Sequence, residues 1–189
     1  MDYIVRKARD SDSFSIARTI AYSFEKVFSV LTKDMERMAK VFEHGVATGR
    51  FYVAEQNGEI IGVIAHGDCA GRVLKATKDD CKKYLGLVRG LLAFRIIRSE
   101  LMRPHSYPAT TGYIDVLGVL PQARGKGIAK ELLKEIIKGN PKYDEFILDV
   151  DSINTSAIKS YTGFGFAEFK RVPAVWFLKR SKVFMKYTV

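Results

Sequence analysis

The segment from Tyr113 to Ala129 (YIDVLGVLPQARGKGIA) constrains the fold more than any other part of the chain. It predicts an apolar strand that ends at a proline, a short turn rich in Arg, Gly and Lys, and a helix that begins at once. Such an order leaves several backbone N–H groups unpaired at a helix N-terminus, where they and the helix dipole favour an anion. Gly125 and Gly127 let the backbone approach a bulky anion closely. The first hypothesis is therefore a phosphorylated ligand.

Two common phosphate loops do not fit this turn. The residues from Gln122 to Gly127 read Q-x-x-G-x-G. They lack the G-x-x-x-x-G-K-[ST] pattern of nucleoside-triphosphate loops and the G-x-G-x-x-G pattern of dinucleotide folds. On the loop alone, a strand-to-helix turn that uses glycine only for its geometry stays an alternative.

A second segment, FILDVDSINTSAIKSYTGFGF at residues 146–166, has the same strand-then-helix order. A short apolar strand at 146–150 leads to a polar turn. Either Asn154 or Thr155 can cap the helix that follows, and this helix ends at the glycines 163–165.

Together these two segments read V-x-P-x-x-R-G-x-G, then L-D-V-x-x-x-N-x-x-A-x-x-x-Y, then G-F. This order resembles the GNAT N-acetyltransferase superfamily over about residues 113–169. The resemblance implies a transferase that moves acetyl from acetyl-CoA to a primary amine by direct attack in a ternary complex. A catalytically silent CoA-binding module, serving as a sensor or interaction domain, is the alternative.

The resemblance also implies where acetyl-CoA, the cosubstrate, binds. The turn amides would wrap the pyrophosphate, the pantetheine arm would pair with an open strand edge, and a helix would contact the arm and the thioester sulfur. The implied cofactor-binding residues are Leu117, Gly118, Val119, Gln122, Arg124, Gly125, Lys126, Gly127, Ile128, Ala129, Asn154 and Tyr161.

Three residues are catalytic candidates. By resemblance, Tyr161 would protonate the leaving thiolate. Asp149 is the leading base candidate, because a Glu that acts as base stands at the matching position in the ribosomal-protein N-terminal acetyltransferase branch. Asp115 is the second candidate, expected to alternate with Tyr113 and Leu117 on one strand face. For either Asp, a solvated or salt-bridged strand residue is the alternative, and for Tyr161 it is a packed aromatic.

Composition sets the outer bounds. A chain of 189 residues with 47% hydrophobic content predicts one domain spanning residues 1–189. No apolar run is long enough for a membrane span, and no Cys/His cluster suggests a metal. Two cysteines and the absence of an apolar leader favour the cytoplasm. The net charge of +10 is spread along the chain and is expected to be a solvated basic surface rather than a nucleic-acid site.

The rest of the chain predicts the elements around this site. A strand is expected at 3–7, amphipathic helices from about residue 12 and at 33–46, and a hairpin at 51–65 around Asn57-Gly58. The last two strands are expected at 166–171 and 183–187. Between them, Trp176, Phe177 and Leu178 would belong to the core or line the acceptor pocket.

An insertion of about residues 70–110 precedes the fourth strand, and a helix is expected from about 80 to 102. It could cover the acceptor site, form a homodimer interface, or touch a membrane surface. The acceptor itself could be a small molecule or a protein amine. The predicted fold is α+β, with a mixed, mostly antiparallel sheet of six or seven strands flanked by helices. It is split between strands 4 and 5, with the inserted helix before strand 4.

Overall fold

A seven-stranded sheet organises the computed structural model, which describes residues 2–173 and 181–189. The strand order is β1-β2-β3-β4-β5-β7-β6. Only β4 and β5 pair in parallel, and every other neighbouring pair is antiparallel. The strands are β1 Ile4–Lys7, β2 Phe51–Gln56, β3 Glu59–Gly67, β4 Thr111–Val119, β5 Glu145–Asp151, β6 Ala167–Val172 and β7 Lys182–Thr188. The predicted fold class is confirmed.

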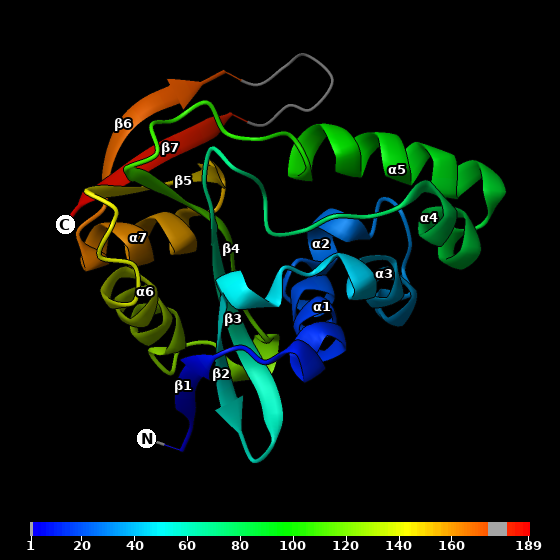
Figure 1. Ribbon diagram of the computed structural model, residues 1–189, viewed down its shortest axis with the longest axis horizontal. Helices are drawn as coiled ribbons and strands as arrows, with labels where there is room; N and C mark the ends of the chain where they lie inside the picture. Colours follow the sequence, from blue (N-terminus) through cyan, green and yellow to red (C-terminus); the bar gives the residue numbers. More distant parts are fainter. Residues whose placement is uncertain (1, 174–180) are drawn as a thin grey trace.

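Helices cover both faces of this sheet. Figure 1 shows α6 and α7 on one side and α1 to α5 on the other. The helices are α1 Ser13–Ser23, α2 Glu25–Phe28, α3 Met35–Phe42, α4 Lys78–Leu85, α5 Leu87–Leu101, α6 Ile128–Lys138 and α7 Thr155–Phe164. Each layer has its own buried apolar cluster, and alternate residues of β3 supply both: Val63 packs in one and Ile64 in the other.

The turn between β2 and β3 is the predicted two-residue hairpin. Asn57 has φ 52° and Gly58 has φ 80°, as a turn that follows the right-handed twist of its strands requires. Glycine and asparagine adopt such angles at low cost. These two residues therefore favour the tight turn, and the turn sets the register of the hairpin.

Strand β4 carries a bulge that corrects one expectation. In the pairing with β3, Ala65 faces Val116 and His66 faces Ile114, so Asp115 is an extra residue. Ile114 therefore packs with the α6 layer and Val116 with the α1 layer, although they are two positions apart. The predicted alternation of Asp115 with its strand neighbours on one face is wrong for this reason.

The insertion before β4 contains two helices, so the single helix expected at 80–102 is also wrong. Gly86, at φ 84°, ends α4 and starts α5. The two helices then pack closely, since a Cβ at Gly90 would lie 2.4 Å from the carbonyl oxygen of Cys81. Gly86 thus allows the chain to reverse between the helices, and Gly90 allows them to pack closely.

The two terminal strands lie where the sequence predicts them, with small shifts at their ends. β7 pairs with β5 on one side and with β6 on the other. Trp176, Phe177 and Leu178, expected in the core or the acceptor pocket, lie outside the described residues.

We predict that Gly90→Ala destabilises the fold by about 1 to 3 kcal/mol, because its methyl group would overlap the Cys81 backbone. Gly163→Ala is the matched control: it is also helical, a Cβ there meets nothing within 4 Å, and alanine favours helix. Urea unfolding of both variants measures the difference. Equal stability of the two variants would contradict the close α4–α5 contact.

Candidate active site

The turn between β4 and α6 has the geometry of an anion site. A short 3-10 helix at Pro121–Ala123 follows the strand, and Gly127 is the N-cap of α6. Gly125 and Gly127 have φ of 79° and 77°, a left-handed conformation that costs other residues about 1 to 2 kcal/mol. The residues from Gln122 to Lys126, apart from Ala123, are exposed, so the turn faces solvent.

The backbone amides of this turn are free. Within residues 2–173 and 181–189, no hydrogen bond uses the N–H groups of residues 125–129. The side chain of Arg124 stabilises the turn, since it donates hydrogen bonds to the carbonyl oxygens of Val119 (3.1 Å) and Ser23 (3.0 Å). Consecutive free amides at the start of an 11-residue helix are suited to a pyrophosphate.

The sheet opens beside this turn. β4 and β5 pair only at Thr111–Glu145, Gly112–Phe146 and Tyr113–Ile147. Beyond that point each strand keeps only its other neighbour: Leu117, Gly118 and Val119 pair with β3, and the end of β5 pairs with β7. The predicted split is confirmed, and it leaves an open edge of β4 leading to the free amides. The turn and edge fit an extended ligand that ends in a diphosphate.

Asp149 lies at the split in a charged cluster. Its carboxylate accepts a hydrogen bond from the Tyr113 hydroxyl and pairs with the Lys182 ammonium at 2.9 Å. Burial would raise the pKa of Asp149, but Lys182 and Tyr113 outweigh it, so the pKa lies below its ordinary value. Asp149 is therefore ionised at neutral pH and well placed to attract a cation.

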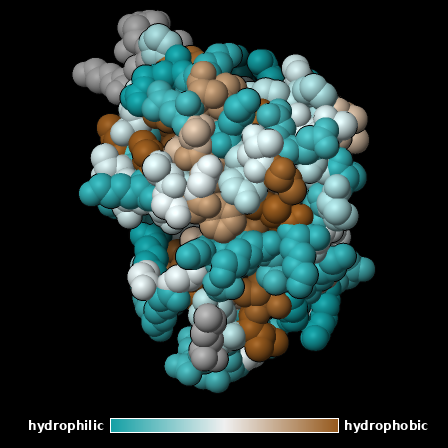
Figure 2. Space-filling model, turned by 90° about the vertical axis from the view of Figure 1, so that its left-hand side faces the viewer, coloured by the Kyte–Doolittle hydropathy of each residue, from teal (hydrophilic) through white to brown (hydrophobic). Residues whose placement is uncertain are grey.

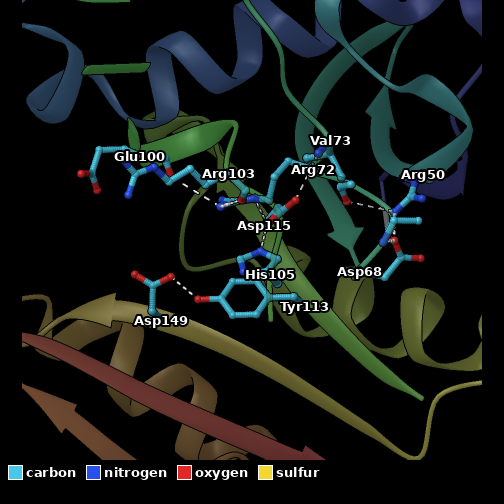
Figure 3. Close-up of polar contacts among 12 residues, drawn as sticks. Arg50, Asp68, Arg72, Val73, Glu100, Arg103, His105, Tyr113, Asp115 and Asp149 are labelled. Carbon is cyan, nitrogen blue, oxygen red and sulfur yellow. Dashed lines mark hydrogen bonds and ion pairs between the residues drawn. The ribbon is translucent and has the colours of Figure 1, made fainter. Parts of the chain in front are cut away.

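Asp115, by contrast, is enclosed. Its side chain is 2% exposed, and it pairs with the Arg72 guanidinium at 2.6 Å and with His105 Nε2 at 2.8 Å. Its other oxygen accepts from the Val73 amide at 3.1 Å. Figure 3 shows these groups converging on Asp115 from both ends of the insertion. The carboxylate thus ties the insertion to the bulge in β4.

The two aspartates are linked by stacked rings. The ring of His105 lies on that of Tyr113, with centroids 3.5 Å apart and planes 20° apart. Tyr107 stacks against Tyr113 as well, at 5.7 Å. Because His105 contacts Asp115 and Tyr113 contacts Asp149, the loop that ends the insertion forms one wall of the site (Figure 3).

The two candidates on α7 lie on the opposite layer. The Asn154 side chain caps the helix, accepting from the Ala157 amide at 3.2 Å. Tyr161 is partly buried against Phe166, with ring centroids 5.9 Å apart. Burial, and then the charge of Asp149, raises the pKa of Tyr161 above its usual value. Its hydroxyl therefore stays protonated at neutral pH and can act as an acid.

The sequence analysis did not predict four residues of this site: Arg72, His105, Tyr113 and Lys182. No pattern in the sequence assigns His105 a role in the site. Lys182 joins Asp149 because β7 inserts beside β5 and pairs Asp151 with Lys182, a long-range register that no local pattern encodes.

Comparisons with known proteins agree with this geometry. The model of the acetyltransferase (GNAT) family matches residues 18–166. A curated relative, N-alpha-acetyltransferase 30 of Saccharomyces cerevisiae, is 37% identical over 73 residues, which are 38% of this chain and 42% of the relative. The aligned part thus spans less than half the length of that relative.

Solved structures share the fold. An N-acetyltransferase from Staphylococcus aureus Mu50 superposes with a TM-score of 0.64 at 18% identity, covering 97% of this chain and all of that one. The yncA protein of Salmonella typhimurium, solved with its cofactor acetyl-CoA, gives 0.59 at 18% identity, covering 100% and 94%. Because the family model matches most of the sequence, the chain belongs to the GNAT acetyltransferase family. It is similar to enzymes that transfer acetyl from acetyl-CoA to an amine.

We predict that Asp115→Asn lowers the free energy of unfolding by about 3 to 5 kcal/mol, because it leaves the Arg72 guanidinium, whose side chain is only 12% exposed, without its counter-charge. Asp79→Asn is the control: its side chain is 92% exposed and its ion pair with Lys82 is long, so about 1 kcal/mol or less is expected. Urea unfolding measures both. If Asp115→Asn keeps full stability but loses turnover, Asp115 acts in the chemistry rather than in holding the insertion.

Proposed function

We propose that this chain is an acetyl-CoA-dependent N-acetyltransferase whose acceptor is a primary amine. The observation that carries the proposal is the row of free amides at residues 125–129, next to the open edge of β4. The family match and the GNAT fold support it. The metal-free, cytoplasmic enzyme predicted from the sequence stays part of the proposal.

In this proposal the chain's backbone does most of the binding. The amides of residues 125–129 bind the pyrophosphate, with Gln122 at the start of the turn. The backbone at Leu117, Gly118 and Val119 pairs with the pantetheine arm as a further strand would. Asn154 contacts the same arm from the start of α7. Holding both substrates in one cleft supplies the largest share of the rate enhancement.

The chemistry then needs one bond made, one broken and two proton movements. The neutral acceptor nitrogen attacks the thioester carbon, an amide C–N bond forms, and the C–S bond breaks. As the amide forms, the nitrogen releases one proton to water, and this proton replaces the one that Tyr161 gives away. Tyr161 gives its proton to the departing sulfur, which its raised pKa permits. An amide N–H of β4 is suited to stabilise the oxygen on which negative charge develops.

Asp149 takes the role of receiving the amine. An alkyl ammonium has a pKa of about 10, and the pKa of Asp149 is lowered, so direct proton abstraction by this carboxylate would be weak. Asp149 instead attracts the ammonium into the cleft, and the ammonium loses its proton directly to water before the neutral amine attacks. The Lys182 ammonium, 2.9 Å away, already marks a position where a cation is bound.

The acceptor class is the finer part of the proposal. The yeast relative is named an N-alpha-acetyltransferase, which favours the α-amine of a protein N-terminus over a small amine. A panel of short peptides and a panel of small amines, each with thiol release as readout, separates the two. Binding of acetyl-CoA without release on either panel would favour the silent CoA-binding module.

We predict that Gly127→Ala weakens acetyl-CoA binding about tenfold, because alanine resists the φ of 77° that presents the amides. Gly49→Ala is the control, since Gly49 is exposed, has no left-handed φ and a Cβ there meets nothing within 4 Å. Calorimetric titration with acetyl-CoA measures both. Unchanged affinity in Gly127→Ala would place the pyrophosphate elsewhere.

We also predict that Tyr161→Phe lowers turnover by roughly 100-fold, as loss of a general acid does, while acetyl-CoA affinity stays within about threefold. Tyr84→Phe, on α4 and away from the split, is the matched control and should keep its rate. Steady-state kinetics on the best acceptor gives the comparison. A loss below about threefold for Tyr161→Phe would remove it from the proton transfer.

A further inference from the structure

The outward face of α5 is unusually apolar for an exposed helix. Five large aliphatic side chains of this 15-residue helix face solvent: Leu87 (65% exposed), Val88 (79%), Leu91 (37%), Leu92 (58%) and Ile96 (39%). Gly90, Ala93 and Ile97, on the opposite side, are buried against the rest of the molecule. One face of α5 therefore packs on the rest of the molecule, and the other exposes aliphatic side chains to solvent. An exposed apolar face of this kind is typical of an interaction surface.

The same face is basic. Arg89, Arg95 and Arg98 are exposed, and within the described residues none of them forms an ion pair. Val88, Leu92 and Arg95 recur at spacings of four and three, so aliphatic and cationic side chains share one side of the helix. An open groove of about 790 Å³ follows this side, and Leu92, Ile96, Arg95 and Arg98 are among the residues that line it.

The charge distinguishes between the possible occupants. Glu100 is the one acidic residue in α5, and it lies at the end of the helix, 3.8 Å from Lys182. Two copies of this face would bring arginines together with few carboxylates to balance them, which opposes a homodimer. Nucleic acid would gain from the arginines, but single strands stack on aromatic rings and this face is aliphatic.

The opposite end of the molecule differs. The face seen in Figure 2, where Figure 1 places α6, α7 and β1, is mostly hydrophilic, with hydrophobic residues in scattered patches. The broad mixture of exposed aliphatic and arginine side chains is a feature of the insertion. Among the described residues, none of the helices is both long and apolar enough to cross a bilayer.

We infer that α5 docks on the surface of an anionic phospholipid membrane. The helix lies in the plane of the interface, with Leu87, Val88 and Leu92 inserted among the acyl chains. Arg95 and Arg98 contact the phosphate groups, and their aliphatic stems remain in the apolar layer. This inference does not rest on acetyl transfer, since it concerns a surface separate from the turn at residues 125–129.

Vesicle sedimentation of the full chain tests it. We expect binding to vesicles of phosphatidylcholine and phosphatidylglycerol at about three to one, little binding to pure phosphatidylcholine, and weakening with salt. Arg95→Gln with Arg98→Gln should weaken binding roughly tenfold or more, because each arginine near an anionic surface contributes. Lys138→Gln with Lys159→Gln is the matched control: both lysines are exposed, the net charge changes equally, and binding should persist.

A second variant tests the contribution of the exposed aliphatic side chains of α5. Leu87→Gln with Val88→Gln and Leu92→Gln should abolish vesicle binding while thermal unfolding is unchanged, since these side chains are exposed. If this variant unfolds early, Leu92→Gln alone carries the test, with at least a threefold loss expected. Absence of vesicle binding, equal binding to neutral vesicles, or full binding by the apolar variant would each overturn the inference. So would an apolar-dependent dimer in light scattering, or RNA binding that only the arginine variant loses.

Discussion

The parting of β4 and β5 after Tyr113 and Ile147 is the constraint on which the site depends. Where the two parallel strands separate, each keeps backbone hydrogen bonds along its other edge: β4 pairs with β3, and β5 pairs with β7. Beyond the last paired residues, the edge of β4 that faces β5 is open, and we propose that an extended ligand pairs with it. Because α6 follows β4 through a tight glycine turn, its free amides lie at one end of that opening. In our proposal, cosubstrate binding is thus a consequence of topology, with few side chains required.

The charged and hydroxyl groups at the split come from distant parts of the chain. Asp149 comes from β5, Lys182 from β7 and Tyr161 from α7. The insertion contributes His105, which stacks on Tyr113 and is fixed by the buried Asp115. The insertion is therefore coupled to the site at one end and presents its apolar, basic helix face at the other. The insertion thus contains both the exposed surface of α5 and the loop that forms one wall of the candidate site.

Local patterns predicted most of this. The glycines of the 122–127 turn, the Asn57-Gly58 hairpin and the Asn154 cap all act through neighbouring residues, and each stands where the sequence indicates. The errors were at points that long-range packing decides. The bulge at Asp115 depends on β3, and the break at Gly86 lets α5 fold back onto Cys81. The Lys182–Asp149 pair depends on the register of β5 and β7, which places residues 33 positions apart side by side (182 − 149).

The most direct test of the account is an NMR titration that follows the backbone amides of residues 125–129. Acetyl-CoA should shift all five resonances strongly, because each N–H gains an anionic acceptor that it lacks in the free protein. Pantetheine, which lacks the pyrophosphate, should leave them nearly unchanged. If acetyl-CoA binds while these amides do not respond, the pyrophosphate lies elsewhere, and the turn at the start of α6 has a structural role only.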